Sequence, residues 1–329
     1  MPNSYIAGLG HYIPELKVTN KDLETMMETT HEWIVERTGI NSRHWADLEK
    51  DSTSNMGTKA ALKALNNANL QPSDIDFIIF CTLSPDYNFP GGGVMVQEQL
   101  GIDTIGALDI RNQCSGFVYG ISVADQFIKS GMYKNVLVIG SEIHSSGLDK
   151  TTRGRNVAVI FGDGAGAVVL RATDKPEKGI LSTHLHSQGK YAEELMVLEP
   201  SSTSTQRTEF IPERIYPVMN GSNVFKHAVT RFPEVIMEAL NKNGYNPTDI
   251  NLLIPHQANL RISQFIQKTM KLRDDQVYNN IMRYGNTTAA SVPIALSEAW
   301  QEGKVKEGDL ICLAAFGSGF TWASALIRW

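Results

Sequence analysis

Short apolar runs alternate with longer amphipathic segments along most of this 329-residue chain. In the first half, residues 76–82, 104–110 and 135–142 have the length and composition of buried strands. Residues 114–129 instead place apolar side chains at helical spacing, and Gly131 follows as a C-terminal cap. Strand–helix alternation of this kind predicts an α/β protein whose layers are built around mainly parallel sheets.

The second half of the chain repeats this alternation. An apolar run over 251–256 is followed by a helix that begins near Asn259 and by another helix after Asn286. A further apolar run over 310–317 has the composition of a buried strand.

Two stretches are also alike in sequence. LNNANLQPSDIDFIIF (65–80) and LNKNGYNPTDINLLIP (240–255) align without a gap, and each predicts a helix end, a turn and a buried strand. We therefore predict two pseudo-symmetric α/β halves, residues 1–172 and 173–329.

A second internal sequence similarity involves two glycine-rich turns. FGDGAGAVVL (161–170) and FGSGFTWASALI (316–327) are both Phe-Gly-x-Gly turns that lead into apolar strands. A dinucleotide-binding loop should open a helix, whereas the residues after the first turn predict a strand, so we exclude that function. The polar stretch 201–210 is predicted to be an exposed loop.

Composition and charge narrow the class of protein. The net charge is −5 and no Lys/Arg-rich run occurs, so we expect no nucleic-acid partner. The N-terminus has no signal-peptide pattern, and no apolar run approaches the length of about 20 residues that spans a bilayer. The three cysteines, Cys81, Cys114 and Cys312, are far apart and odd in number, as expected of reduced thiols in a cytoplasmic protein.

Cys114 stands where a strand gives way to a helix, after the polar run Arg111, Asn112 and Gln113. The free amides and the dipole of a helix N-terminus stabilise a thiolate, so we expect a lowered pKa for Cys114. The same amides could hold an oxyanion after the sulfur attacks a carbonyl. The alternative is an inert, buried cysteine, which suits Cys81 and Cys312 better.

His256 and Asn286 both lie between a predicted strand or turn and a predicted helix. Ligands of parallel α/β sheets bind at the carboxyl ends of the strands, where His256 is expected. The alternatives are a histidine satisfied in a turn and an asparagine that caps a helix. His184 and His186 share one face of a strand, but no third ligand is near in sequence, so we expect no metal site.

In these surroundings the chain resembles the β-ketoacyl-acyl-carrier-protein synthase III family of thiolase-fold enzymes. Segments similar to family signatures occur in family order over nearly the whole chain: THEWIVERTGI (30–40), CSGFVYGISVADQFIKSG (114–131), RGRNVAVIFGDGAGAVVL (153–170), STHLHS (182–187), PHQANLRI (255–262), YGNTTAASVPIAL (284–296) and AFGSGFTWASALIR (315–328). The resemblance implies a thiolase-like fold with two βαβαβ halves in five layers, α-β-α-β-α.

The resemblance also implies a reaction. Cys114 would take an acyl group from an acyl-CoA primer, and a malonyl unit on acyl carrier protein would then lose CO2 and attack the thioester. His256, in its neutral form, and Asn286 would donate hydrogen bonds to the malonyl thioester oxygen. The backbone amides of Cys114 and Ser318 would form the oxyanion hole. No metal or redox cofactor is needed, because decarboxylation drives carbon–carbon bond formation.

Further positions carry family roles by resemblance. Trp33 and Arg153 match a pair that sandwiches the CoA adenine, and Phe89 matches a residue that closes the acyl pocket of the partner in a homodimer. Thr29 and Arg37 match residues that contact CoA. Asn259 matches a residue that supports the active-site histidine and is grouped with the CoA site. Lys226 and Arg261 match basic residues at which the carrier protein docks.

Some positions depart from the family pattern. Asn112 and Gln113 replace small residues before the cysteine, Ser318 replaces a glycine, and Ser222 stands where asparagine is common. A serine at 318 keeps its amide but could restrict the turn. These departures leave the acyl primer open.

Three other functions share parts of this pattern. The order Cys114, His256, Asn286 imitates papain-like cysteine hydrolases, but their local signature and disulfides are missing. A non-catalytic acyl-CoA-binding protein is disfavoured because all three residues are present. A condensing or acyl-transfer enzyme of secondary metabolism, with an unusual primer or with malonyl-CoA as extender, would share this fold and these residues.

Overall fold

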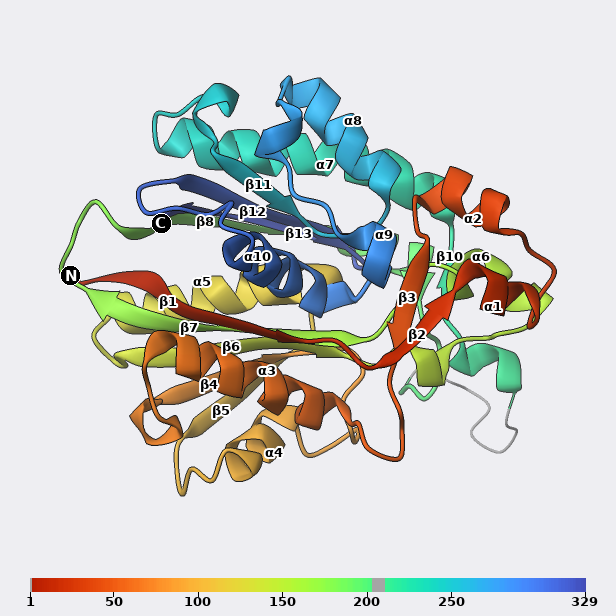
Figure 1. The fold of residues 1–329 in the computed structure, drawn as a ribbon, viewed down its shortest axis with the longest axis horizontal. Helices are drawn as coiled ribbons and strands as arrows, with labels where there is room; N and C mark the ends of the chain where they lie inside the picture. Colours follow the sequence, from red (N-terminus) through yellow and green to blue (C-terminus); the bar gives the residue numbers. More distant parts are fainter. Residues whose placement is uncertain (1, 203–210) are drawn as a thin grey trace.

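Two mixed β-sheets form the centre of the molecule in the computed structural model, which describes residues 2–202 and 211–329. The first sheet has the strand order β1-β7-β6-β4-β5, and the second has the order β11-β12-β13-β8 (Figure 1). The strands of the first sheet are β1 (Asn3–Tyr12), β4 (Phe77–Cys81), β5 (Gly106–Ile110), β6 (Asn135–Glu142) and β7 (Gly164–Thr173). Those of the second are β8 (Gly179–Ser187), β11 (Leu252–Pro255), β12 (Leu310–Gly317) and β13 (Thr321–Arg328).

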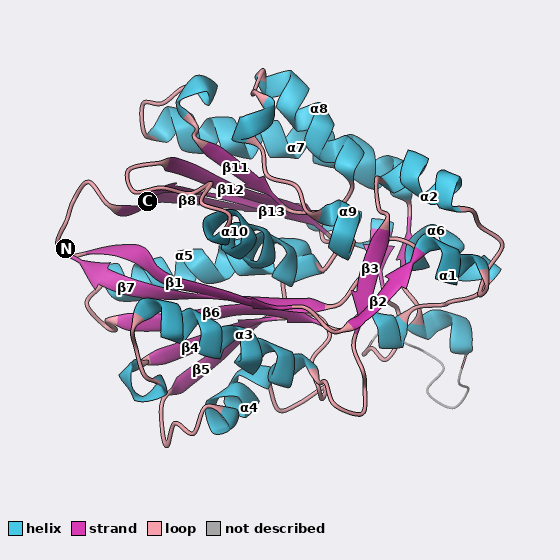
Figure 2. Cartoon of the chain, in the orientation of Figure 1, coloured by secondary structure: helices cyan, strands magenta, loops and turns pink. Residues whose placement is uncertain are grey.

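Helices cover both sheets and fill the space between them, giving five layers (Figures 1 and 2). The central layer holds α5 and α10, and the outer layers hold α3 and α4 on one side and α7 and α8 on the other. Their bounds are α3 (Thr53–Ala68), α4 (Gly92–Gln99), α5 (Gly116–Lys129), α7 (Gly221–Lys242), α8 (Leu260–Met270) and α10 (Ser291–Gln301). The predicted thiolase-like α-β-α-β-α architecture is confirmed.

The central helices are buried on nearly every side because each is covered by a sheet and by its neighbours. Phe117, Val118 and Ile121 of α5 share one apolar cluster with Val292 and Leu296 of α10. The predicted helix over 114–129 is observed as a short 3₁₀ turn that runs directly into α5. The apolar side chains meet across the layer and hold the starts of both helices in place.

The two repeated stretches adopt the same structure. Each runs from a helix (α3 or α7) through a capping box at a 3₁₀ turn, Gln71 with Asp74 and Asn246 with Asp249, into a buried strand (β4 or β11). The counterpart of the edge strand β5 is reduced in the second half to a single parallel bridge between Leu253 and Val277.

The expectation of mainly parallel sheets was wrong. Strand β4 is parallel to β5 and β6, and β11 is parallel to β12, but β7 and β13 are antiparallel to their neighbours. A tight turn at 318–320 joins β12 to β13, and the segment 143–163, with only 3₁₀ turns and the short helix α6 (Arg155–Ala158), joins β6 to β7, so neither connection contains a long crossover helix. The predicted loop over 201–210 lies almost entirely outside the described residues.

Smaller elements surround one end of the sheets, on the right in Figure 1. They are β2 (Leu16–Thr19), α1 (Asn20–Glu24), α2 (His31–Thr38), β3 (Ser42–Trp45), α6 (Arg155–Ala158), β9 (Leu195–Met196), β10 (Val218–Met219) and α9 (Ile281–Tyr284). None of the helices in the described part of the chain is both long and apolar enough to cross a membrane.

Candidate active site

Cys114 lies in the 3₁₀ turn that opens helix α5, and its side chain is buried. The preceding residue, Gln113, has a φ of +45°, a left-handed conformation that is uncommon for a side-chain-bearing residue. The buried Ser115 side chain stabilises the turn. Its Oγ lies 2.7 Å from Thr321 Oγ1 and accepts a hydrogen bond from Asn112 at 3.1 Å. The strained turn presents the sulfur at the end of both sheets.

The electrostatics of Cys114 differ from the sequence-based expectation. Burial and the nearby Glu142 carboxylate raise the pKa of the Cys114 thiol to about 12, although backbone hydrogen bonds from Cys114 and Ser318 oppose this rise. The prediction of a lowered pKa was therefore wrong for this structure, because desolvation outweighs the amides of the helix N-terminus. The two backbone N–H groups assigned to an oxyanion hole nevertheless both meet at the sulfur.

Close packing at the end of β12 brings the second amide to the sulfur. A Cβ added at Gly317 would lie 2.6 Å from Cys114 Cβ and 3.0 Å from its Sγ, so only glycine allows this approach. Ser318 has no positive φ, and its hydroxyl donates a hydrogen bond to the Leu195 carbonyl at 2.5 Å. Serine is therefore accommodated in the turn without backbone strain.

His256 follows β11, and its backbone N–H donates to Ala314 of β12 at 2.8 Å. Its Nδ1 lies 2.5 Å from Ser291 Oγ, and its Nε2 is buried without a hydrogen-bond partner among the described residues. Burial lowers the pKa of His256 to about 3. The imidazole is therefore neutral at physiological pH, as expected, and one ring nitrogen is free for a ligand.

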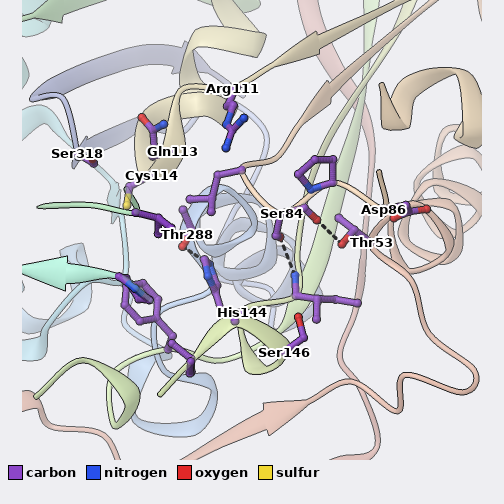
Figure 3. A pocket seen from close by; sticks show the side chains of 18 of the residues that line it. Thr53, Ser84, Asp86, Arg111, Gln113, Cys114, His144, Ser146, Thr288 and Ser318 are labelled. Atoms are coloured by element: carbon purple, nitrogen blue, oxygen red, sulfur yellow. Dashed lines mark hydrogen bonds between the residues drawn. The ribbon is translucent and has the colours of Figure 1, made fainter. Parts of the chain in front are cut away.

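Asn286 is buried and fixed at one end of its amide. Its Oδ1 accepts a hydrogen bond from the Thr288 backbone N–H at 2.8 Å, and its backbone N–H donates to Ile160 at 2.9 Å. Thr288 has a φ of +49°, and its hydroxyl lies 2.5 Å from His144 Nε2 (Figure 3). Because Oδ1 is occupied, the NH2 group of Asn286 is the end left to donate to a ligand.

A cavity of about 860 Å³ opens beside these groups. Cys114, Thr288 and Ser318 line it together with His144 and Phe161, whose rings lie 4.7 Å apart (Figure 3). Burial lowers the pKa of His144 to about 4, so this ring is also neutral. Cys114 thus lies on the cavity wall with Ser318 and Thr288, whereas His256 and Asn286 are buried and are not among the residues that line the cavity.

Two guanidinium groups stand close to the ring of Trp33 on α2. Those of Arg37 and Arg155 stand 4.6 and 4.7 Å from its ring centre. Arg153 is directed elsewhere, because its guanidinium donates to Asp149 at 2.5 Å and to Glu213 at 2.7 Å. The expected neighbour of Trp33 is therefore replaced by Arg155, two positions along the chain.

The remaining CoA-contact candidates lie in the same part of the molecule as Trp33. The Thr29 hydroxyl is buried without a hydrogen-bond partner among the described residues. Asn259 caps α8 and donates to the Arg37 carbonyl at 2.9 Å, so it ties α8 to α2. His256 is instead supported by Ser291.

The two candidate docking residues lie on adjacent exposed helices. Lys226 is on α7 and Arg261 is on α8, and the Arg261 guanidinium stands 5.9 Å from the ring of Phe225. Neither forms an ion pair with a described residue. Both basic side chains are exposed, and we refer to the two together as the positive patch.

Phe89 does not line the cavity of its own chain. It is 86% exposed, on the loop between β4 and α4. The neighbouring strand β5 is the edge of its sheet, and Leu108 on it is also exposed.

His184 and His186 both interact with one carboxylate. Glu238 lies 3.2 Å from His184 Nδ1 and 2.6 Å from His186 Nε2. Within the described ranges no group of three or more His, Cys, Asp or Glu residues is arranged to hold a metal ion.

Sequence reasoning missed Ser291, His144, Glu142 and Arg155. Ser291 lies in a quoted signature, but its position at a helix start indicates a cap as readily as a partner for His256. His144 and Glu142 follow an apolar run, and their contacts are set by the packing of distant segments. The sequence carries one signal for Arg155: it lies two positions after Arg153, so either arginine could have been predicted as the neighbour of Trp33.

The fold and the buried cysteine define a thiolase-like enzyme, and comparisons with known proteins agree. Family models for 3-oxoacyl-[acyl-carrier-protein] synthase III match residues 108–189, and their C-terminal counterpart matches residues 240–329. A β-ketoacyl-[acyl-carrier-protein] synthase III of Rhodospirillum centenum is 45% identical, with 99% of each chain covered.

Solved structures give the same result. The 3-oxoacyl-[acyl-carrier-protein] synthase III of Aquifex aeolicus is 43% identical with a TM-score of 0.92, covering 99% of this chain and 100% of that one. A priming β-ketosynthase from the R1128 polyketide pathway is 32% identical with a TM-score of 0.92, covering 99% and 96%. The chain belongs to the β-ketoacyl-[acyl-carrier-protein] synthase III family of condensing acyltransferases.

Proposed function

We propose that this enzyme joins an acyl-CoA primer to malonyl-acyl carrier protein and releases CoA, CO2 and a β-ketoacyl-carrier protein, the first condensation of fatty acid synthesis. The observation that carries the proposal is the buried Nε2 of His256, which has no hydrogen-bond partner among the described residues. The first half of the chain, 1–172, supplies the nucleophile, and the second half, 173–329, supplies the two donors.

In the first step Cys114 attacks the acyl-CoA carbonyl. A thiol whose pKa is raised to about 12 is protonated at neutral pH. Its S–H bond therefore breaks as the new S–C bond forms, and the departing CoA sulfur takes up the proton. The backbone N–H groups of Cys114 and Ser318 stabilise the oxyanion that forms in between.

In the second step the malonyl thioester loses CO2, and its carbonyl oxygen gains negative charge as an enolate. Ser291 Oγ accepts a hydrogen bond from the Gln257 backbone N–H at 3.4 Å. The serine hydroxyl can therefore donate its own proton to His256 Nδ1, 2.5 Å away. His256 then carries its own proton on Nε2 and donates it as a hydrogen bond to the enolate oxygen, together with Asn286. Two neutral donors stabilise a charge that exists only during the reaction.

In the last step the enolate carbon attacks the acyl-cysteine carbonyl. The new carbon–carbon bond forms, the S–C bond to Cys114 breaks, and the sulfur leaves as a thiolate that takes up a proton from solvent. The same two backbone N–H groups stabilise the second oxyanion. Carbon dioxide leaves in the preceding step, which makes the condensation irreversible.

The surface features fit the two substrates and a dimer. We assign CoA binding to Trp33, with Thr29, Arg37, Arg155 and Asn259 around it, because an indole face and guanidinium planes suit a purine base. Arg153 would join this site by exchanging its ion pairs with Asp149 and Glu213 for the ligand.

The acidic carrier protein would dock on the positive patch of Lys226 and Arg261. A homodimer along the β5 edge would bring the exposed Phe89 of one chain to the cavity of the other. We place the enzyme in the cytoplasm, where both substrates occur.

The test is direct observation of the acyl-enzyme. After incubation with acyl-CoA, mass spectrometry should find one acyl group on the peptide that contains Cys114. Cys114→Ala should carry none, and Cys312→Ala, a matched change at a buried cysteine, should be acylated. Acylation of another residue with Cys114 bare would overturn the proposal.

A second function is favoured by one comparison. The structural similarity to a priming ketosynthase of a polyketide pathway supports a condensing enzyme of secondary metabolism, with an unusual primer or with malonyl-CoA as extender. Kinetics with malonyl-carrier protein and malonyl-CoA, each paired with a panel of primers, separate the two functions.

A further inference from the structure

The wall of the cavity next to the nucleophile is polar. Gln113 directly precedes Cys114, and Arg111 directly follows strand β5. Both side chains line the same cavity as Cys114, and Figure 3 shows the three along one side of it, across from His144 and Ser146. Arg111 is exposed and Gln113 is partly buried, so an unsubstituted alkyl chain that covers them would displace their water without replacing its hydrogen bonds.

The polar groups on this wall are free hydrogen-bond donors. Among the described residues, neither the Arg111 guanidinium nor the Gln113 amide has a hydrogen-bond or ion-pair partner. A guanidinium offers five N–H donors and a primary amide offers two. They therefore present an excess of donors at the place where the acyl chain leaves the sulfur.

The acidic side chains of the cavity are already occupied, so they do not neutralise this wall. Asp51 accepts from Lys59 at 2.7 Å and from Tyr12 at 3.1 Å. Asp86 accepts from the Ser54 backbone at 2.9 Å and from the Ser52 hydroxyl at 3.1 Å. Their oxygens are held by the protein and not by Arg111 or Gln113.

Apolar side chains complete the cavity, including Met95, Ile143, Leu148 and Phe161. A fitting primer therefore combines a hydrocarbon chain with an oxygen that accepts hydrogen bonds near its thioester end. A ketone, a hydroxyl group and a terminal carboxylate share this acceptor chemistry, and a guanidinium binds the carboxylate most strongly.

We propose that Arg111 and Gln113 select an acyl primer that carries an acceptor oxygen beyond its thioester carbonyl, in preference to a plain alkyl primer. This inference rests on the proposed function, since it names the class of primer loaded on Cys114. A site built to bind such an oxygen discriminates against the analogue that lacks it, because its donors then lose their partners.

The experiment measures only the first step, acylation of Cys114, with four matched four-carbon primers. These are butanoyl-CoA, acetoacetyl-CoA, 3-hydroxybutanoyl-CoA and succinyl-CoA, and intact-mass spectrometry follows the rate at limiting primer. We expect at least one oxygenated primer to acylate the enzyme at least about tenfold faster than butanoyl-CoA, which corresponds to about 1.4 kcal/mol.

The variants assign the preference to the two residues. Arg111→Met with Gln113→Met should reduce the ratio of the favoured primer to butanoyl-CoA by at least about fivefold, which corresponds to about 1 kcal/mol, the typical net contribution of one hydrogen bond. Arg273→Met, a matched change of an exposed arginine that follows the C-terminal end of α8, should keep the wild-type ratio.

Two results would overturn the inference: butanoyl-CoA reacting as fast as all three oxygenated primers, or a ratio that the double variant leaves unchanged. In both cases Cys114 is acylated and the proposed function stands. If none of the four primers acylates Cys114, the proposed function itself fails, and this inference fails with it.

Discussion

His256 Nδ1 and Ser291 Oγ lie 2.5 Å apart, which joins the residue after strand β11 to the first residue of helix α10. The serine thereby fixes both the orientation of the ring and the nitrogen that carries the proton. The other nitrogen, Nε2, is buried and free, so the function assigned to His256 depends on a residue that itself touches no substrate.

Ser291→Ala should therefore slow decarboxylation and leave the acylation of Cys114 almost intact. Loss of a partner for a buried polar group costs about 1–3 kcal/mol, or roughly 5–150-fold in rate. CO2 release and acylation are measured separately, and Ser291→Thr, which keeps the hydroxyl, should restore much of the rate. Equal loss in both steps would mean that Ser291 only supports the fold.

The raised pKa of Cys114 predicts how its reactivity depends on pH. With a pKa of about 12, the thiolate fraction increases tenfold for each pH unit between pH 7 and pH 10. The rate of alkylation of Cys114 by iodoacetamide, followed by peptide mass spectrometry, should therefore rise without a plateau over this range. A plateau near neutral pH would show instead that the helix N-terminus prevails over burial.

Trp33→Ala should weaken binding of acyl-CoA but not of malonyl-carrier protein, because only CoA carries an adenine. Cation–π contacts of a desolvated ring contribute up to about 2 kcal/mol, so KM for acyl-CoA should rise by up to roughly thirtyfold. Steady-state kinetics with each substrate varied in turn check this. An equal effect on both substrates would place the adenine elsewhere.

Arg261→Glu should have the opposite selectivity. Reversal of a charge on the positive patch should raise KM for the acidic carrier protein at low salt, and the effect should shrink as salt screens the interaction. Lys242→Glu, at the far end of α7, is the matched control. An unchanged KM at low salt would remove Arg261 from the docking face.

Local patterns in the sequence were sufficient for some features and not for others. The strands over 76–82 and 135–142 could be predicted because apolar runs depend on neighbours in sequence. The direction of β7 could not, since periodicity carries no information on how a turn returns the chain. The sign of the pKa shift of Cys114 failed for a similar reason: its burial arises from Gly317, about two hundred positions away.

In the candidate site, too, some features could be predicted from local sequence and others depend on the packing of distant segments. Cys114, His256 and Asn286 were found because each lies at a strand–helix junction within a recognisable signature. The hydrogen bonds that orient two of them, from Ser291 and from Thr288 beside His144, join segments whose contact follows only from the packed layers.

The most direct test of the proposed mechanism is a single experiment on Asn286→Ala, with acylation of Cys114 and CO2 release from malonyl-carrier protein measured on the same sample. Loss of one oxyanion-type donor typically lowers a rate by about 10²–10³-fold. We predict that Cys114 is acylated at a rate close to wild type while CO2 release falls by that factor. Equal loss of acylation and CO2 release, or undiminished CO2 release, would contradict the assignment of Asn286 to the enolate and the division of labour on which the mechanism rests.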